Sequence, residues 1–281
     1  MKPRICLSIG NTGLNGVYEA IDYAKSKSAE LVELRFDMIT ETAMLKNQNI
    51  DSDKSSALTE IKKIISYAKD KKIKIIGTNR DPSYGFNRCV SFLERQVVSE
   101  SETSEKNLKC GVKETSEPER IKFLRSVMEL GIDICDIELD TLKKADIKNL
   151  IGFAHSKNSQ VILSVHDFNG RIDMLDTVKY YIDSSYFGAD YFKITDTAVS
   201  EEDAALIVEK NIKIGSIKMS AEEVFPKFII FGMGEKGKIA RALSVINGSY
   251  FAYCSSPYGI TAAGQTLPED FYKTVSLLEA S

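Results

Sequence analysis

Short apolar segments rich in β-branched residues recur along the chain, and amphipathic segments separate them. Eight segments have the length and composition of strands: 4–10, 29–37, 72–80, 133–139, 160–167, 190–196, 227–233 and 249–255. The segments between them, such as 16–28 and 57–72, carry apolar residues three and four positions apart, which predicts helices. Eight strands, each followed by a helix, predict an α/β fold of the (β/α)₈ TIM barrel type, with residues 1–281 forming a single domain.

One polar segment interrupts this alternation. Residues 98–117, VSESETSEKNLKCGVKETSE, lie between the third and fourth predicted strands. Exposed polar loops tolerate insertions, so we interpret the segment as a surface insertion rather than as part of a site. No linker divides the chain, which favours one barrel over an open sheet with a second domain.

The parity of residues in four predicted strands separates polar side chains from apolar ones, because successive side chains of a strand point to opposite faces. The polar sets are Glu33, Arg35 and Asp37; Asp136 and Glu138; Ser164 and His166; and Tyr191, Lys193 and Thr195. The apolar residues between them must pack against helices, so we expect the polar sets to face the barrel interior. They also gather towards the C-terminal ends of their strands, where barrel enzymes carry their active sites. Burying so many ionisable groups is costly unless they pair or react.

These residue types predict carbonyl chemistry. A lysine partly desolvated inside a barrel, here Lys193, would have a lowered pKa, and its neutral amine could condense with a ketone or aldehyde to a Schiff base. His166 on the neighbouring strand is a candidate general acid or base, and Glu33 or Glu138 could orient its ring. Three arginines could hold a substrate carboxylate through paired hydrogen bonds: Arg35, Arg80 and Arg241.

Composition and charge argue against other classes of protein. The formal net charge of -3 gives no electrostatic reason to expect nucleic-acid binding. No apolar segment approaches the ~18 residues of a membrane span, and the apolar segment near the N-terminus is too short for a signal peptide, so we expect a cytoplasmic protein. The five cysteines are dispersed without C-x-x-C spacing, as reduced thiols are. With only two histidines and no G-x-S-x-G motif, we expect neither a metal site nor a serine nucleophile.

The segment FIIFGMGEKGKIARAL, residues 228–243, matches two nucleotide-binding motifs incompletely. Gly232, Gly234 and Gly237 have the G-x-G-x-x-G spacing, but no acidic residue ends the next predicted strand. A P-loop needs Ser or Thr after its lysine, and that position is Ile239. We therefore interpret the glycines as the turn between the seventh strand and its helix, whose N–H groups favour an anion such as a substrate carboxylate.

Taken together, the motifs resemble those of the type I 3-dehydroquinate dehydratase family. Six segments match in the family's order: ELRFD (33–37), DIEL (136–139), SVHDF (164–168), YFKIT (191–195), MGEKGKIAR (233–241) and TAAGQ (261–265). The resemblance implies a lyase that converts 3-dehydroquinate to 3-dehydroshikimate and water by syn elimination. This is the third step of the shikimate pathway to chorismate and the aromatic amino acids, and the family uses neither metal nor cofactor.

The resemblance also implies a role for each matching residue. Lys193 would form the imine with the C3 ketone of the substrate. His166 would remove the C2 proton and then protonate the departing C1 hydroxyl, supported by Glu33. The implied substrate-binding residues are Ser8, Arg35, Arg80, Glu138, Met233, Arg241, Thr261 and Gln265. Members of the family are often dimers, so a homodimer is the assembly to test.

The chain departs from the family pattern in two loops. After Arg80 the family has a Glu-Gly-Gly turn, whereas this chain has DPSYGF, with Tyr84 and Phe86 at two of those positions. The lid motif reads TAAGQ in place of Ser-Ala-Pro-Gly-Gln, which predicts a looser hinge. Two alternatives stay open: another Schiff-base barrel, such as a transaldolase-like or deoxyribose-phosphate aldolase-like enzyme, and a barrel without catalysis that serves as a binding module.

Overall fold

A computed structural model of the protein describes six segments of the chain: residues 3–39, 50–80, 117–139, 142–168, 170–220 and 224–280. The loop DPSYGF and nearly all of the predicted insertion lie outside the described residues, so both interpretations stay predictions.

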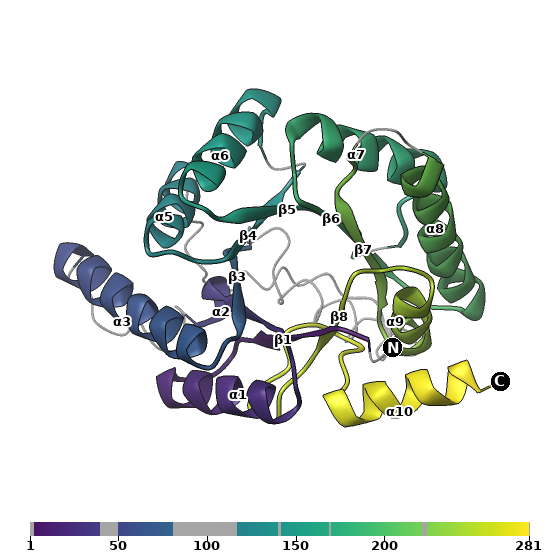
Figure 1. Ribbon diagram of the computed structural model, residues 1–281, viewed down its shortest axis with the longest axis horizontal. Coiled ribbons are helices and arrows are strands. Elements are labelled where there is room, and N and C mark those ends of the chain that lie inside the picture. Colours follow the sequence, from purple (N-terminus) through teal and green to yellow (C-terminus); the bar gives the residue numbers. More distant parts are fainter. Residues whose placement is uncertain are drawn as a thin grey trace, which may run out of the picture.

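Eight parallel strands form one sheet in the order β7-β6-β5-β4-β3-β2-β1-β8, which curls into a barrel (Figure 1). The strands are β1 (Ile5–Ile9), β2 (Leu31–Arg35), β3 (Lys74–Thr78), β4 (Ile134–Glu138), β5 (Gln160–His166), β6 (Tyr191–Thr197), β7 (Lys227–Met233) and β8 (Ala252–Cys254). Each follows its predecessor around the ring, and β8 returns to pair with β1. The prediction of a (β/α)₈ barrel is confirmed.

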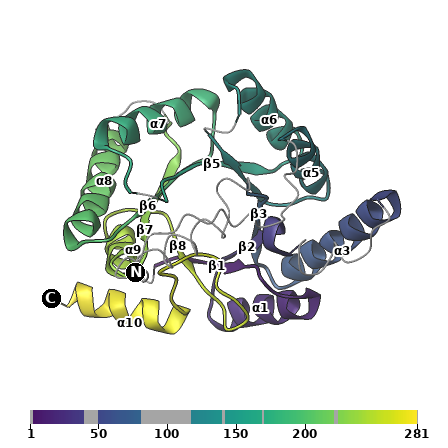
Figure 2. The same ribbon diagram turned by 180° about the vertical axis from the view of Figure 1, so that it is seen from behind.

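Helices surround the strands on the outside, as Figures 1 and 2 show from opposite sides. They are α1 (Leu14–Ser26), α2 (Phe36–Ile39), α3 (Ile50–Asp70), α5 (Glu117–Glu129), α6 (Lys144–Ser156), α7 (Met174–Phe187), α8 (Glu201–Ser220), α9 (Gly237–Ile246) and α10 (Pro268–Glu279). None of the helices that the structure describes is both long and apolar enough to cross a membrane.

The alternation of strand side chains divides the core into two layers. The apolar residues Val32, Leu34, Phe192 and Ile194 belong to the layer between strands and helices, as their parity predicts. A second apolar cluster comes from the opposite parity and includes Ile76, Ile134, Ile162, Ile229 and Phe251. Because these side chains occupy the inside of the barrel below the polar residues, they form an apolar floor for the site.

One predicted element ends earlier than its sequence pattern indicates. The segment 29–37 reads as a strand throughout, but β2 ends at Arg35 and the chain continues as α2. Asp37 therefore lies on a helix rather than on the inward face of the strand. Its carboxylate nevertheless contacts a member of the predicted polar set, because it accepts hydrogen bonds from Arg35 at 2.9 and 2.6 Å.

Candidate active site

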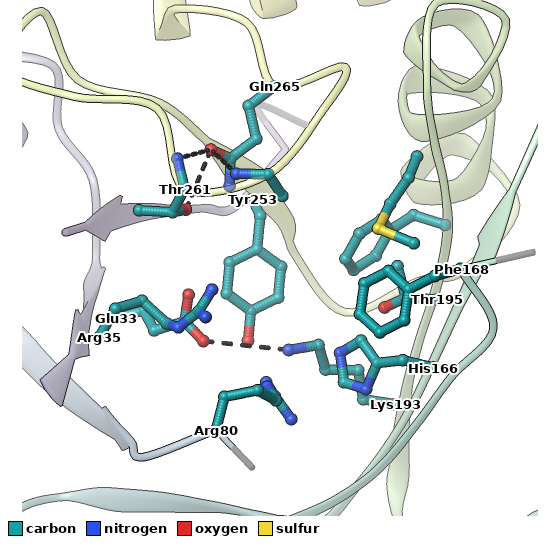
Figure 3. Close-up of a pocket in the computed structure, with 13 residues that line it drawn as sticks. Glu33, Arg35, Arg80, His166, Phe168, Lys193, Thr195, Tyr253, Thr261 and Gln265 are labelled. Carbon is teal, nitrogen blue, oxygen red and sulfur yellow. Dashed lines mark hydrogen bonds and ion pairs between the residues drawn. The ribbon is translucent and has the colours of Figure 1, made fainter. Parts of the chain in front are cut away.

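A pocket opens at the C-terminal ends of the strands, where the sequence places the polar side chains (Figure 3). It is lined by Glu33, Arg35, Arg80, His166, Phe168, Lys193, Thr195, Phe231, Met233, Tyr253, Thr261, Ala262 and Gln265. Six of these are predicted site residues other than Lys193 and His166, and both Lys193 and His166 are present as well. The pocket thus collects side chains that are more than 200 positions apart in the sequence, as the barrel topology requires.

The side-chain amine of Lys193, the candidate nucleophile, lies at the bottom of this pocket. The residue is 3% exposed, and its Nζ donates a hydrogen bond to Asp136 Oδ2 at 2.9 Å. Glu33 Oε1 lies 3.9 Å from the same nitrogen, and the centroid of the Tyr253 ring lies 4.5 Å from it. Two carboxylates and an aromatic face therefore surround this nitrogen inside the barrel.

Glu33 is fixed by hydroxyl groups on both of its carboxylate oxygens. Ser8 donates to Oε2, and Thr78 Oγ1 donates to Oε1 at 2.8 Å. Thr261 Oγ1 donates in turn to Ser8 Oγ at 2.7 Å. Ser8 therefore lies behind the pocket wall and connects the loop that carries Thr261 to the carboxylate beside Lys193.

His166 ends β5 on the same side of the barrel, and its ring stacks on Phe168 with the centroids 5.9 Å apart. Desolvation inside the barrel lowers the pKa of His166 well below its ordinary value, and the nearby cations Arg80 and Lys193 lower it further. The imidazole is consequently neutral at physiological pH and can accept a proton, as a general base must.

A buried ion-pair network supports the pocket from β4. Arg80 donates to both carboxylate oxygens of Asp136, at 3.2 and 3.1 Å, and to Glu138 at 3.3 Å. Burial alone would raise the pKa of Asp136, but the cations Arg80 and Lys193 hold it well below its usual range. Asp136 is thus an anion placed between the pocket arginine and the pocket lysine. Glu138 lies behind Arg80 and does not line the pocket.

Arg120 completes this network, although sequence reasoning missed it. The residue comes from α5, is 1% exposed and forms an ion pair with Glu138. Its position relative to Leu124 and Val127 puts it on the apolar face of the helix, and both of those residues are buried. A charged residue on the apolar face of a helix could have identified Arg120 as a buried partner. For Asp136, strand parity already predicted a position inside the barrel.

The loop 256–266, here called the lid loop, follows β8 and covers one side of the pocket. Gln265 Oε1 accepts hydrogen bonds from the backbone N–H and the hydroxyl of Thr261, both at 3.1 Å. Gly264 has a φ of +76°, and a Cβ there would lie 2.3 Å from the carbonyl oxygen of Gly234. The glycines of the β7–α9 turn and of the lid loop therefore allow the two backbones to touch.

The same close packing explains Gly237, where α9 begins. A Cβ at this position would lie 2.7 Å from the carbonyl carbon of Gly232, so the turn needs both glycines for its backbone geometry. The interpretation as a tight barrel turn fits this packing. Binding of a substrate carboxylate at this turn stays a prediction.

Arg241 lies behind the residues that line the pocket. Its guanidinium donates to the carbonyl of Gly232 at 3.0 Å and to that of Tyr253 at 3.2 Å, and it stacks 4.4 Å from the centroid of the Phe231 ring. Desolvation by burial lowers its pKa to about 10. The prediction that Arg241 holds the substrate carboxylate stays untested.

Thr195, which strand parity places on the face of Lys193, also lines the pocket. The sequence did not single out the other pocket residues as site residues: Phe168, Phe231, Tyr253 and Ala262. Strand parity could have found two of them, since Phe231 shares the face of Met233 and Tyr253 alternates with the outward Ala252 and Cys254. Within the described part of the chain, no group of three His, Cys, Asp or Glu side chains could hold a metal ion.

Comparisons with known proteins agree with this geometry. The model of a family described as Type I 3-dehydroquinase matches residues 5–281. A curated 3-dehydroquinate dehydratase of Coxiella burnetii is 29% identical over 155 residues, covering 54% of this chain and 60% of the relative. The chain thus spans about three-fifths of the length of the first curated relatives it matches. One of Methanococcus maripaludis is 24% identical over 233 residues, covering 82% and 97%.

Solved structures share the fold. A 3-dehydroquinate dehydratase of Geobacillus kaustophilus superposes with a TM-score of 0.75 at 19% identity, covering 100% of this chain and 92% of the other. A type I enzyme of that name from Clostridium difficile gives 0.72 at 23% identity, covering 100% and 93%. At these identities the solved structures establish the barrel fold only, so any argument about the reaction must come from the residues of the pocket.

Proposed function

The chain belongs to the type I 3-dehydroquinase family, and from this premise we propose that it dehydrates 3-dehydroquinate to 3-dehydroshikimate and water. In the cell this would be the third step of chorismate biosynthesis. The observation that carries the proposal is the buried amine of Lys193, held 2.9 Å from Asp136 in the pocket that also contains a neutral His166. An amine beside a base is what elimination through an imine needs.

The first step is formation of the imine. Lys193 first gives a proton to a neighbouring base, and its neutral nitrogen then adds to the C3 carbonyl as the C=O π electrons move to oxygen. That oxygen takes one proton from the attacking nitrogen and a second from the protonated base, and it leaves as water. The product is a protonated imine, whose positive charge acidifies the hydrogen atoms on C2. Asp136 and Glu33 lie 2.9 and 3.9 Å from the nitrogen, so their charges would stabilise the iminium cation.

The second step is elimination of water across C1 and C2. We assign the removal of the C2 proton to the neutral imidazole of His166, with the C–H electrons moving towards the iminium. The enamine electrons then form the C1=C2 bond and restore the iminium as the imidazolium gives its proton to the C1 hydroxyl, which leaves as water. Because the depressed pKa of His166 makes its protonated form a stronger acid than an ordinary imidazolium, this proton transfer is favoured. One group serving both positions accounts for a syn elimination, and a second water hydrolyses the imine.

The other residues would bind an anionic, hydroxyl-bearing substrate. Arg35, Arg80, Met233, Thr261 and Gln265 line the pocket and are proposed to contact it directly. Ser8, Glu138 and Arg241 lie behind the wall, so we propose that they act mainly by positioning Glu33, Arg80 and the strand ends. Support of His166 by Glu33, a cytoplasmic location and a homodimer stay predictions from the resemblance.

The family match favours dehydration over the aldolase alternatives, which would also place a lysine on β6. A trapping experiment separates imine chemistry from a barrel that only binds. The protein is mixed with 3-dehydroquinate and borohydride, and the modified peptide is mapped by mass spectrometry. We expect an adduct on Lys193, and a rise in absorbance from the enone product when borohydride is absent.

The matched variants are Lys193→Met and Lys227→Met. Lys227 is a partly buried lysine at the opposite end of the barrel, where β7 begins. We expect Lys193→Met to lose the adduct and to lower turnover by at least ~10³-fold, while Lys227→Met retains both. A reduced adduct on any residue other than Lys193 would refute the assignment of the nucleophile.

A further inference from the structure

Tyr253 carries a buried hydroxyl that no described residue satisfies. The residue is 2% exposed, it lines the pocket, and its Oη has no hydrogen-bond partner among the described residues. In Figure 3 the hydroxyl points into the space between Glu33, Arg80 and Lys193. Folded proteins keep very few buried polar groups in this state, because each one has lost its hydrogen bond to water.

The neighbours of the hydroxyl are already engaged with other groups. Glu33 accepts hydrogen bonds from Ser8 and Thr78, and Lys193 donates to Asp136. The Lys193 nitrogen lies over the face of the tyrosine ring rather than against its oxygen, 4.5 Å from the centroid. The hydroxyl is therefore available to a ligand that reaches Lys193.

A second hydroxyl in the same pocket is in the same state. Thr195 Oγ1 is buried and has no hydrogen-bond partner among the described residues. By contrast, Tyr191 faces the interior at the other end of β6, and its hydroxyl donates to Gln160 at 3.2 Å. At the end of the barrel away from the pocket, the interior tyrosine has a hydrogen-bond partner. In the pocket, where a substrate would bind, two buried hydroxyls have none among the described residues.

We propose that Tyr253 is a substrate-contacting residue whose hydroxyl donates a hydrogen bond to a substrate oxygen beside the carbon that Lys193 attacks. This inference rests on the proposed function. Two oxygens offer the same acceptor chemistry: the carbonyl oxygen under attack, which gains negative charge as the C–N bond forms, and a hydroxyl on the adjacent carbon. Desolvation and the nearby Glu33 raise the pKa of Tyr253 well above its ordinary value, so the group stays a donor at neutral pH.

The variant Tyr253→Phe isolates the hydroxyl, because it keeps the ring over Lys193 and removes only one oxygen. In the free protein the substitution deletes an unsatisfied group, so we expect an unchanged or higher Tm. With substrate it deletes a donor, so kcat/KM for 3-dehydroquinate should fall about tenfold. The matched control is Tyr191→Phe, which removes a satisfied hydroxyl: its Tm should not rise, and its kcat/KM should stay within about twofold of the wild type.

Two further measurements identify the acceptor. If the partner is a lasting hydroxyl, Tyr253→Phe weakens equilibrium binding of the product 3-dehydroshikimate, and that of a product analogue without the C3 ketone, about tenfold. If the partner is the attacked carbonyl oxygen, binding of the analogue is unchanged and the imine trapped by borohydride forms about tenfold more slowly in a single turnover. Either result supports the contact.

The inference is overturned if the wild type is active and Tyr253→Phe lies within twofold of it in kcat/KM, product binding and imine formation. A lower Tm for Tyr253→Phe also overturns it, since the hydroxyl would then have a partner in the free protein. A wild type that does not turn over 3-dehydroquinate refutes the proposed function itself, and this inference with it.

Discussion

At the scale of single residues, His166 gives the protein a predictable response to acid. Its pKa is lowered well below the ordinary value by desolvation and by Arg80 and Lys193, whereas in the unfolded chain it returns to about 6.5. Between these two values the unfolded chain binds one more proton than the folded protein. The free energy of unfolding therefore rises with pH in this window and is lost as pH falls below about 6.5, by up to ~1.4 kcal/mol per pH unit.

Urea unfolding at several pH values between 5 and 8 measures this slope in the wild type and in His166→Gln, which should lose it. The control is His155→Gln, which removes the other histidine of the chain, a surface residue bonded to Asp190. The acid limb of kcat/KM should likewise lie below pH 6.5, because the free enzyme keeps its base neutral there. If the acid limb of the pH profile of kcat/KM were centred at or above pH 6.5, the pocket would not lower the pKa of His166.

At this scale sequence reasoning brought the pocket side chains together but did not identify their hydrogen-bond partners. Strand parity placed Glu33, His166 and Lys193 in one interior, because alternation is a local property of a strand. Which carboxylate meets which cation depends on register between strands far apart in sequence. Lys193 on β6 pairs with Asp136 on β4, and β5 lies between these two strands. No local sequence pattern predicts a contact between strands that are not neighbours.

At the scale of elements, a buried ion pair joins α8 to β6. Asp196 and Lys210 pair directly, and Asp196 also accepts a hydrogen bond from the backbone N–H of Ile172 at 3.0 Å. Burial raises the pKa of Asp196 in spite of this lysine, which shows how costly the carboxylate would be without it. Lys210→Met should lower the free energy of unfolding by roughly 3–5 kcal/mol, because it leaves a buried charge unpaired.

Chemical denaturation of Lys210→Met and Lys213→Met provides the measurement and its control. Lys213 lies on the same helix but is exposed, so the same substitution there should change stability by less than about 0.5 kcal/mol. Equal, small effects of the two variants would mean that Asp196 is protonated in the folded protein and needs no cation.

Element boundaries were less predictable than element types. The segment 249–255 reads as one strand, but β8 contains only Ala252–Cys254, because only these residues pair with β1. Hydrophobic pattern indicates what a segment can become, whereas pairing and packing with neighbours decide where it stops.

At the scale of the whole molecule, the barrel depends on how its ends meet. β1 and β8 pair as parallel strands, but β7 and β8 stand at the two ends of the strand order and share no ladder in the described chain. Hydrogen bonds instead join β7 to the residues just before β8: Tyr250 N–H donates to the carbonyl of Phe228 at 2.8 Å, and Ile230 N–H donates to Ser249 Oγ at 3.0 Å.

Arg241 also bridges this junction between β7 and β8, here called the seam, near the C-terminal ends of the strands. Its guanidinium donates to a carbonyl at the end of β7 and to one in β8, so a side chain supplies the donors that a neighbouring strand would otherwise provide. The repeat of strand and helix in the sequence predicted a barrel, but it could not predict this seam. The motif containing Arg241 instead directed attention to the substrate.

The two roles of Arg241 make different predictions for the free protein. If the arginine closes the seam, Arg241→Met removes two charge-assisted hydrogen bonds, and the free energy of unfolding should fall by ~3 kcal/mol, less any relief from no longer burying a cation. For a domain of this size that corresponds to a decrease in Tm of roughly 5–10 °C. Lys238→Met is the matched control, since Lys238 lies one turn earlier on α9, is only partly buried and pairs with the exposed Glu235. Differential scanning calorimetry without substrate decides the question: an unchanged Tm together with a raised KM would assign Arg241 to the substrate carboxylate alone, whereas a lower Tm shows that the barrel itself needs this side chain to stay closed.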